Sequence, residues 1–265
     1  MKILRMLRSN MRRAIINKRF IIAVLLIAIF EYMDVFHLIY SNYADGSSSD
    51  MAGYTLVELL LSTGVTMFWG MSITVCLMPY SCAYIEDEEN NSVTYMSVRS
   101  SKVLYSVSTV LTCGLSAFLC VVLGKVLFFI ISSFSCDVCN PYTLEMYGDF
   151  ITSLSEGNYW GFIAGNVILC GLRGSFFALV GMLTSCYVKN KMVIYSTPIL
   201  LFYFFTKFGY FNLHLPEYLD IVAIYMTYVF GNKHELFSIL YAFAFTLCVG
   251  VITAYSVNRE VRRRY

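Results

Sequence analysis

Apolar residues gather into long runs along this chain, separated by short polar stretches. A helix needs about 20 apolar residues to cross the hydrocarbon core of a bilayer. Six runs reach that length, at residues 20–40, 56–84, 103–134, 159–188, 192–211 and 237–257. The second, third and fourth runs exceed the core thickness, so we expect them to tilt or to continue as helix outside it. The pattern predicts an all-α membrane protein with six transmembrane helices, forming a single transmembrane domain over residues 1–265.

A further apolar segment at 215–230 raises the question of a seventh span. Its uninterrupted core, 221–230, is too short to cross the membrane. Pro216 suits a first helical turn and Gly231 suits a helix stop. We therefore predict that residues 212–233 form a short extracellular re-entrant or interfacial segment before the last span.

Basic residues alternate with acidic ones from loop to loop. Seven Lys or Arg residues lie within residues 1–19, two follow the second span, two follow the fourth, and four arginines end the chain. The first and third loops carry Asp and Glu but no Lys or Arg. Because positive charge is retained on the cytoplasmic side, both termini are predicted to be cytoplasmic in a multi-pass protein of the cell (inner) membrane.

Residues 1–19 form a separate predicted element. Apolar residues recur there at helical spacing, and arginines occupy much of the remaining surface. A basic amphipathic helix of this kind lies in the membrane interface. Whether it does so, or only anchors the first span through its charge, is left open by the sequence.

Composition agrees with lipid as the main solvent. The chain is 58% hydrophobic and only 14% charged, with a net charge of +2; a soluble domain is about a quarter charged. Seven of the nine cysteines fall in or beside apolar runs, where Cys packs as a small hydrophobe. Cys136 and Cys139 instead lie together in a polar loop. The sequence leaves three interpretations of this pair open: a disulfide, part of a metal site, or two free thiols.

Enzymatic motifs are missing from the chain. No G-x-x-x-x-G-K-[ST] phosphate loop and no H-E-x-x-H zinc motif occur in the sequence. We therefore predict no catalytic residue, no metal, no cofactor and no nucleic-acid partner for this chain. The remaining candidates are a cytoplasmic loop at 85–102 and several charges inside the apolar runs.

The loop at 85–102 begins with an acidic cluster and continues into a short stretch with an apolar face. It resembles the coupling loop of ABC exporter permeases of the type-2 class, as does the whole six-span architecture. The matching residues are Glu86, Glu88 and Glu89 in the acidic part, the turn at Asn91 and Ser92, and Val93, Tyr95, Met96 and Arg99 in the short helix. Asn91 replaces the commoner glycine.

The resemblance implies a transport subunit. It implies that the loop docks on a separate ABC ATPase subunit that binds ATP and Mg²⁺, and that two permeases pair as a homodimer or a paralogous heterodimer. The exported substrate would be amphipathic, such as a peptide, lipid or drug. Two alternatives stay open: a plain solvated loop, and a membrane sensor or assembly protein that recruits a cytoplasmic partner without transport.

Glu31, Asp34, Lys125 and Arg173 fall inside apolar runs, where charges are costly and often functional. At about 1.5 Å per residue, Glu31 and Arg173 lie at similar depths. Asp34 and Lys125 are matched in the same way, nearer the outer side. We predict two ion pairs, with structural pairing favoured over substrate contact.

Overall fold

Helices account for all regular secondary structure in the described part of the chain. The computed structural model describes residues 2–44, 55–62, 68–93, 95, 101–139, 156–206, 221–225 and 235–264. The helices are α1 (Lys2–Ile15), α2 (Lys18–Ala44), α3 (Leu56–Ser62), α4 (Phe68–Leu77), α5 (Ala83–Glu89), α7 (Lys102–Ser132), α10 (Tyr159–Ser185), α11 (Lys191–Phe204), α12 (Ile221–Ile224) and α13 (Glu235–Arg264). No strand occurs within these ranges.

Four of these helices are long and apolar enough to cross a membrane. They cover Lys18–Tyr40, Lys102–Ser132, Tyr159–Ser185 and Leu236–Arg264. The prediction of an all-α, multi-pass membrane protein is therefore confirmed. The count of six spans stays a prediction, because α11 has only 14 residues and the second predicted span is divided among shorter helices.

The second predicted span ends earlier than the hydrophobic pattern indicated. Helix α4 stops at Leu77, turns occupy residues 78–82, and α5 begins at Ala83. Pro79 lies in these turns. Proline lacks a backbone N–H and disfavours helical backbone in the residue before it, so the apolar run continues through Tyr84 although the helix does not.

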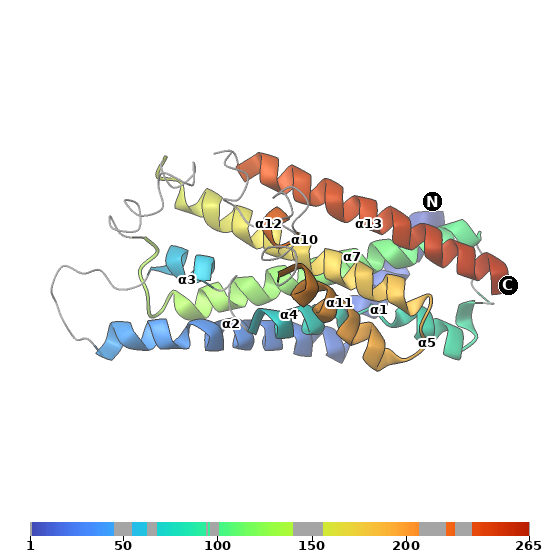
Figure 1. Cartoon of the computed structure of the whole chain (residues 1–265), viewed down its shortest axis with the longest axis horizontal. Coiled ribbons are helices and arrows are strands. Elements are labelled where there is room, and N and C mark those ends of the chain that lie inside the picture. Colours follow the sequence, from blue (N-terminus) through green and yellow to red (C-terminus); the bar gives the residue numbers. More distant parts are fainter. Residues whose placement is uncertain are drawn as a thin grey trace.

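Helix α10 is the central helix of the bundle and the most buried of the four long ones (Figure 1). Two glycines explain how closely its neighbours approach. A Cβ on Gly174 would lie 2.5 Å from Val121 Cγ2 on α7, and one on Gly181 would lie 2.6 Å from Leu77 Cδ2 on α4. Larger residues at these positions would push both neighbours away, so small residues set the packing here, as is common between membrane helices.

Both termini lie at one end of the bundle, the end at which α5 is found (Figure 1). Helix α3 lies toward the opposite end, where its first residues bond to the chain after α7: Leu56 N donates to the Asp137 carbonyl at 2.9 Å. This arrangement agrees with the predicted side for both termini. Which side of a membrane that end faces stays a prediction.

The predicted amphipathic helix within residues 1–19 corresponds to α1, which packs along the beginning of α7. Asn10 Nδ2 lies 3.4 Å from Ser108 Oγ, and Ala14 is fully buried. A bend at residues 16–17 then separates α1 from α2. Part of the apolar face of α1 is thus covered by protein, while Arg5, Arg8 and Arg12 are exposed.

Most of the predicted re-entrant segment 212–233 lies outside the described residues. Within the described part, 221–225, the side chains of Ile221, Ile224 and Tyr225 are buried against the core. Tyr225 packs on Phe176 of α10, with ring centroids 5.7 Å apart, and its hydroxyl lies 2.8 Å from Thr246 Oγ1 of α13. These residues therefore enter the helix bundle instead of lying on its surface.

Candidate functional site

Helix α5 carries four consecutive acidic residues, Glu86, Asp87, Glu88 and Glu89, which we call the acidic hub. The helix stops just after them because Asn91 adopts a left-handed backbone, with φ of 55°. Glycine and asparagine are the residues that tolerate this conformation best. Asparagine in place of the commoner glycine therefore preserves the turn, and Asn91 N donates to the Glu88 carbonyl at 3.0 Å.

Asp87 is the buried centre of the hub. Its carboxylate forms an ion pair with Arg13 of α1. It also accepts a hydrogen bond from the Tyr105 hydroxyl at 3.1 Å and one from the Ser92 hydroxyl at 3.2 Å. Burial opposes the charge on Arg13, but the hydrogen bond and charge of Asp87 outweigh it and raise the pKa of Arg13. Asp87 thus joins α1, α5 and α7 through one buried carboxylate.

Glu86 connects the hub to the beginning of α2. Its Oε1 lies 2.5 Å from Arg19 Nη1, and its Oε2 lies 3.8 Å from Arg13 Nη2. The junction between α1 and α2 is therefore held on both sides by α5.

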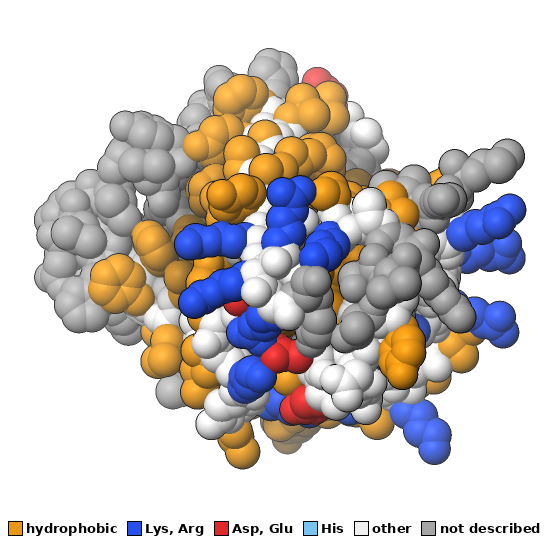
Figure 2. All heavy atoms as spheres, turned by 90° about the vertical axis from the view of Figure 1, so that its right-hand side faces the viewer, with side chains coloured by type: hydrophobic (Ala, Val, Ile, Leu, Met, Phe, Trp, Pro, Cys, Tyr) orange, Lys and Arg blue, Asp and Glu red, His pale blue; other side chains and the backbone are white. Residues whose placement is uncertain are grey.

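Glu88 and Glu89 connect the hub to the last part of the chain. Glu88 Oε1 lies 2.7 Å from Lys189 Nζ and 2.5 Å from Arg264 Nη1, and Glu89 Oε2 lies 3.1 Å from Lys191 Nζ. Figure 2 shows this end of the molecule, with many basic side chains around a few acidic ones. One seven-residue helix therefore pairs with basic residues from three separate parts of the sequence: the N-terminal segment, the loop with Lys189 and Lys191, and the C-terminal arginines.

The structure gives the predicted docking residues different environments. The glutamates lie in the hub, where they already make ion pairs within the chain. Val93 is fully buried, in the same apolar cluster as Ile85 and Tyr105, so its side chain is not available to a partner. Tyr95 is 73% exposed. Met96 and Arg99 lie outside the described residues.

The four intramembrane charges lie on α2, α7 and α10, and α7 packs against both of the other helices. All four are buried, and Arg173 and Asp34 lie near enough to Glu31 to act on its charge. The ion pair between Lys125 Nζ and Glu31 Oε2 measures 3.0 Å. Matching by depth had assigned Lys125 to Asp34 and Glu31 to Arg173. The structure places Lys125 Nζ beside Glu31 across the contact between α2 and α7, and the pairs Glu31 with Arg173 and Asp34 with Lys125 stay predictions.

Cys136 and Cys139 lie half-buried just beyond the end of α7. The two residues between them accept hydrogen bonds from the backbone of α3, at Leu56 and Val57. A disulfide between them stays a prediction. Across the described residues, no group of three His, Cys, Asp or Glu side chains is placed to hold a metal ion.

Sequence reasoning missed Asp87 and the basic partners of the hub. The resemblance matches only Glu86, Glu88 and Glu89, so Asp87 belongs to the predicted acidic cluster without a role of its own. A signal was present, since the charge rule places the basic N-terminal segment, Lys189, Lys191 and the C-terminal arginines on the same side as the hub. Acidic residues on a predominantly basic side are candidates for intramolecular ion pairs.

The pKa of Glu88 gives a test of the hub. Burial raises this pKa, but the hydrogen bond from Lys189 and the charge of Arg264 outweigh burial and hold it below its ordinary value of 4.5. The stabilising contribution is therefore complete above the ordinary pKa and is lost as the pH falls through the lowered one. A nitroxide at Arg263→Cys, in a background without the native cysteines, should gain mobility only below about pH 4.5.

Two variants accompany this measurement of nitroxide mobility by electron paramagnetic resonance. Glu88→Gln should make the label mobile already at pH 7, because the carboxylate that holds Arg264 is absent. Glu89→Gln is the matched control, since its partner Lys191 lies on a different segment, and the label should not respond to it. A label equally mobile in all three proteins would show that Glu88 does not hold the C-terminal tail.

Models of protein families, curated proteins and solved structures were compared with this chain, and none matches it. The functional assignment therefore depends on the sequence pattern and on the contacts described above.

Proposed function

We propose that this chain is the transmembrane permease subunit of an ATP-driven ABC exporter, with ATP hydrolysed by a separate nucleotide-binding subunit. The observation that carries the proposal is the acidic hub. A cytoplasmic force applied to α5 would reach α1 and α2 through Arg13 and Arg19, and α13 through Arg264. This is the linkage that an ATPase needs in order to move membrane helices through one short loop.

The surface offered to the ATPase differs from the one that the apolar spacing predicted. Val93 faces the core of its own chain, whereas Tyr95 is exposed two residues later. Tyrosine is enriched among residues that dominate binding energies at protein interfaces. We therefore propose that Tyr95 is the main apolar contact with the ATPase. The hub would hold the loop in place through its ion pairs with α1, α2 and α13.

The proposed permease has six spans and works as a pair. In this proposal α3 and α4 together make the second span, and α11 with the residues after it makes the fifth. Helices α2 and α11 both contact α4, and each presents exposed apolar side chains, among them Ile29 and Phe36 on α2 and Phe204 on α11. These three adjacent segments are the proposed face between two permeases, along which an amphipathic peptide, lipid or drug would be exported.

The test uses the ATPase subunit that we expect to be encoded beside this chain. With both expressed together, the wild-type chain should co-purify that subunit and stimulate its ATP hydrolysis in vesicles. Tyr95→Asp should reduce both by about tenfold or more, the effect of losing 1.4 kcal/mol or more at an interface. Membrane insertion should be unchanged because the loop lies outside lipid.

Tyr187→Asp is the matched control. Tyr187 is also exposed and follows α10 in the inner loop that contains Lys189. Normal ATPase binding by Tyr95→Asp would remove the docking assignment. Recovery of the wild-type chain with a histidine kinase, and without any ATPase, would favour the sensor alternative instead.

A further inference from the structure

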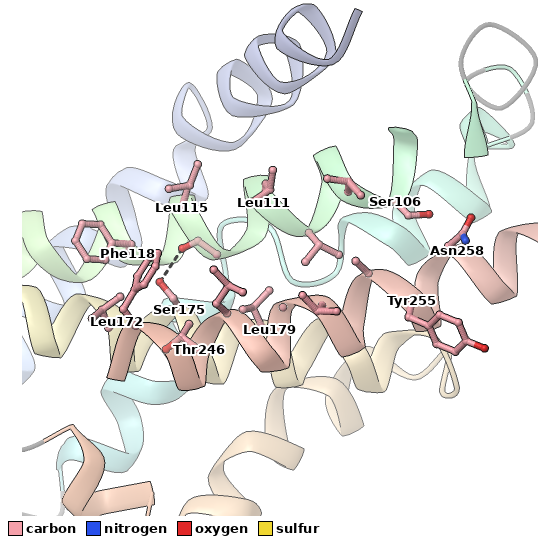
Figure 3. Close-up of a pocket in the computed structure, with 18 of the residues that line it drawn as sticks. Ser106, Leu111, Leu115, Phe118, Leu172, Ser175, Leu179, Thr246, Tyr255 and Asn258 are labelled. Atoms are coloured by element: carbon pink, nitrogen blue, oxygen red, sulfur yellow. Dashed lines mark hydrogen bonds between the residues drawn. The ribbon is translucent and has the colours of Figure 1, made fainter. Parts of the chain in front are cut away.

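A long apolar groove runs between α7 and α13, on a floor formed by α10. Its volume is about 730 Å³, within the range of small-molecule sites. Figure 3 shows Leu111 and Leu115 of α7, Leu179 of α10 and Thr246 of α13 along it, with Ser106, Tyr255 and Asn258 together at one end. None of the contacts proposed above for transport or for the ATPase uses this groove.

The deep part of the groove contains two hydroxyl residues, Ser175 and Thr246, and both hydroxyls already make hydrogen bonds within the chain. Ser175 Oγ donates to the Gly114 carbonyl at 2.9 Å (Figure 3). Thr246 Oγ1 lies 2.8 Å both from the Ala242 carbonyl and from the Tyr225 hydroxyl. An occupant of this part therefore needs no polar atoms, which fits a hydrocarbon chain.

The other end of the groove is polar and then basic. Asn258 Oδ1 is buried with no hydrogen-bond partner among the described residues. Arg262 lies one helical turn beyond Asn258 and is exposed, and Lys102 lies one turn before Ser106 on the opposite wall. Among the described residues neither cation has a carboxylate partner. Along the groove, the cationic side chains therefore come first, the amide and hydroxyl side chains next, and the apolar lining last.

We propose that this groove binds one anionic phospholipid. Its phosphate would lie between Lys102 and Arg262, a hydroxyl of its headgroup would donate to Asn258 Oδ1, and one acyl chain would lie along the apolar part. The length agrees, because α7 rises about 22 Å from Val103 to Phe118, and one leaflet with its headgroups is about 20–22 Å thick. Basic residues at a membrane surface favour anionic lipids.

The test measures lipid retained by the purified chain, without any ATPase. Vesicles contain equal amounts of phosphatidylglycerol and phosphatidylcholine, and native mass spectrometry follows gentle detergent extraction. The wild-type chain should retain one phosphatidylglycerol per chain. The double variant Lys102→Gln with Arg262→Gln should reduce the preference for phosphatidylglycerol over phosphatidylcholine roughly thirtyfold. Each of the two cations is expected to contribute about a factor of five to this preference.

A second variant fills the groove itself. A Cβ on Gly250 meets only Leu179, at 3.7 Å, so Gly250→Leu should fold and place its side chain in the open groove. It should abolish the retained lipid. Two controls are matched: Ala244→Leu on the same helix but outside the groove lining, and Arg263→Gln, which the helical spacing turns away from the groove. Both should keep the lipid.

Two results would overturn the proposal. One is Gly250→Leu retaining as much phosphatidylglycerol as Ala244→Leu. The other is efficient disulfide cross-linking between chains in vesicles through Leu247→Cys, a groove residue, in a background without the native cysteines. That result would assign the groove to a second copy of this chain.

Discussion

Replacing Lys125 with alanine is expected to destabilise the helix bundle by about 3–5 kcal/mol, the cost of leaving one member of a buried ion pair without its partner. Lys125 is 1% exposed and its Nζ lies 3.0 Å from Glu31 Oε2. In the variant the Glu31 carboxylate would remain buried at membrane depth, where an isolated charge is costly. The midpoint of thermal unfolding in detergent, followed by size-exclusion chromatography, measures the loss.

A rescue experiment identifies the partner of Lys125. Adding Glu31→Gln to Lys125→Ala should restore much of the lost stability, because no buried charge is then left unpaired. Adding Asp34→Asn instead should restore less. The two double variants differ only in which carboxylate is neutralised, so the comparison distinguishes the observed pair from the one expected by depth. Better rescue by Asp34→Asn would show that depth had identified the correct partner.

Depth along a helix is not enough to choose among the possible partners of these buried charges. Counting residues along a helix gives the height of a side chain in the membrane, and by height it matched Glu31 with Arg173 and Asp34 with Lys125. It does not give the direction in which the side chain points. That direction depends on how the helices pack: Glu31 and Asp34 both lie on α2, which contacts α7, and it is the Glu31 carboxylate that lies 3.0 Å from Lys125 Nζ.

The loop at 85–102 shows a second limit of sequence reasoning. The acidic residues and their side of the membrane could be predicted from composition and charge. Apolar spacing also marked Val93 as a residue that needs a partner surface. It could not tell whether that surface belongs to another protein or to the same chain, and Val93 is buried in its own cluster with Ile85 and Tyr105.

The long spans were the most predictable part of the fold, because about 20 apolar residues in a row have few alternatives. The interrupted ones were not. Pro79 was present in the sequence, yet the apolar run continues beyond it to Tyr84, and hydrophobicity alone does not distinguish a helix from a buried turn. Contacts between distant segments, such as Arg264 with Glu88, depend on packing that no local pattern contains.

The second large effect is expected at Asp87. Asp87→Asn keeps the size of the side chain but removes the charge that Arg13 binds and weakens the acceptor for Tyr105 and Ser92. Hydrogen bonds to charged groups contribute about 1.5–3 kcal/mol each. Because Arg13 is partly exposed and can be rehydrated, we expect a total loss of about 2–3 kcal/mol, measured by thermal unfolding. Glu89→Gln, which breaks an exposed ion pair, should cost less than about 1 kcal/mol.

The same two variants show whether the hub only stabilises the fold or also transmits force from the ATPase to the membrane helices. If α5 transmits force from the ATPase to α1 and α7, Asp87→Asn should still bind the ATPase, since Tyr95 is unchanged, but should lose stimulation of its ATP hydrolysis. Glu89→Gln should keep both. Assays run well below the unfolding temperature of Asp87→Asn exclude loss of folded protein as the cause. A variant that is destabilised yet stimulates the ATPase normally would show that Asp87 only holds the fold together, and that force reaches the membrane helices by another route.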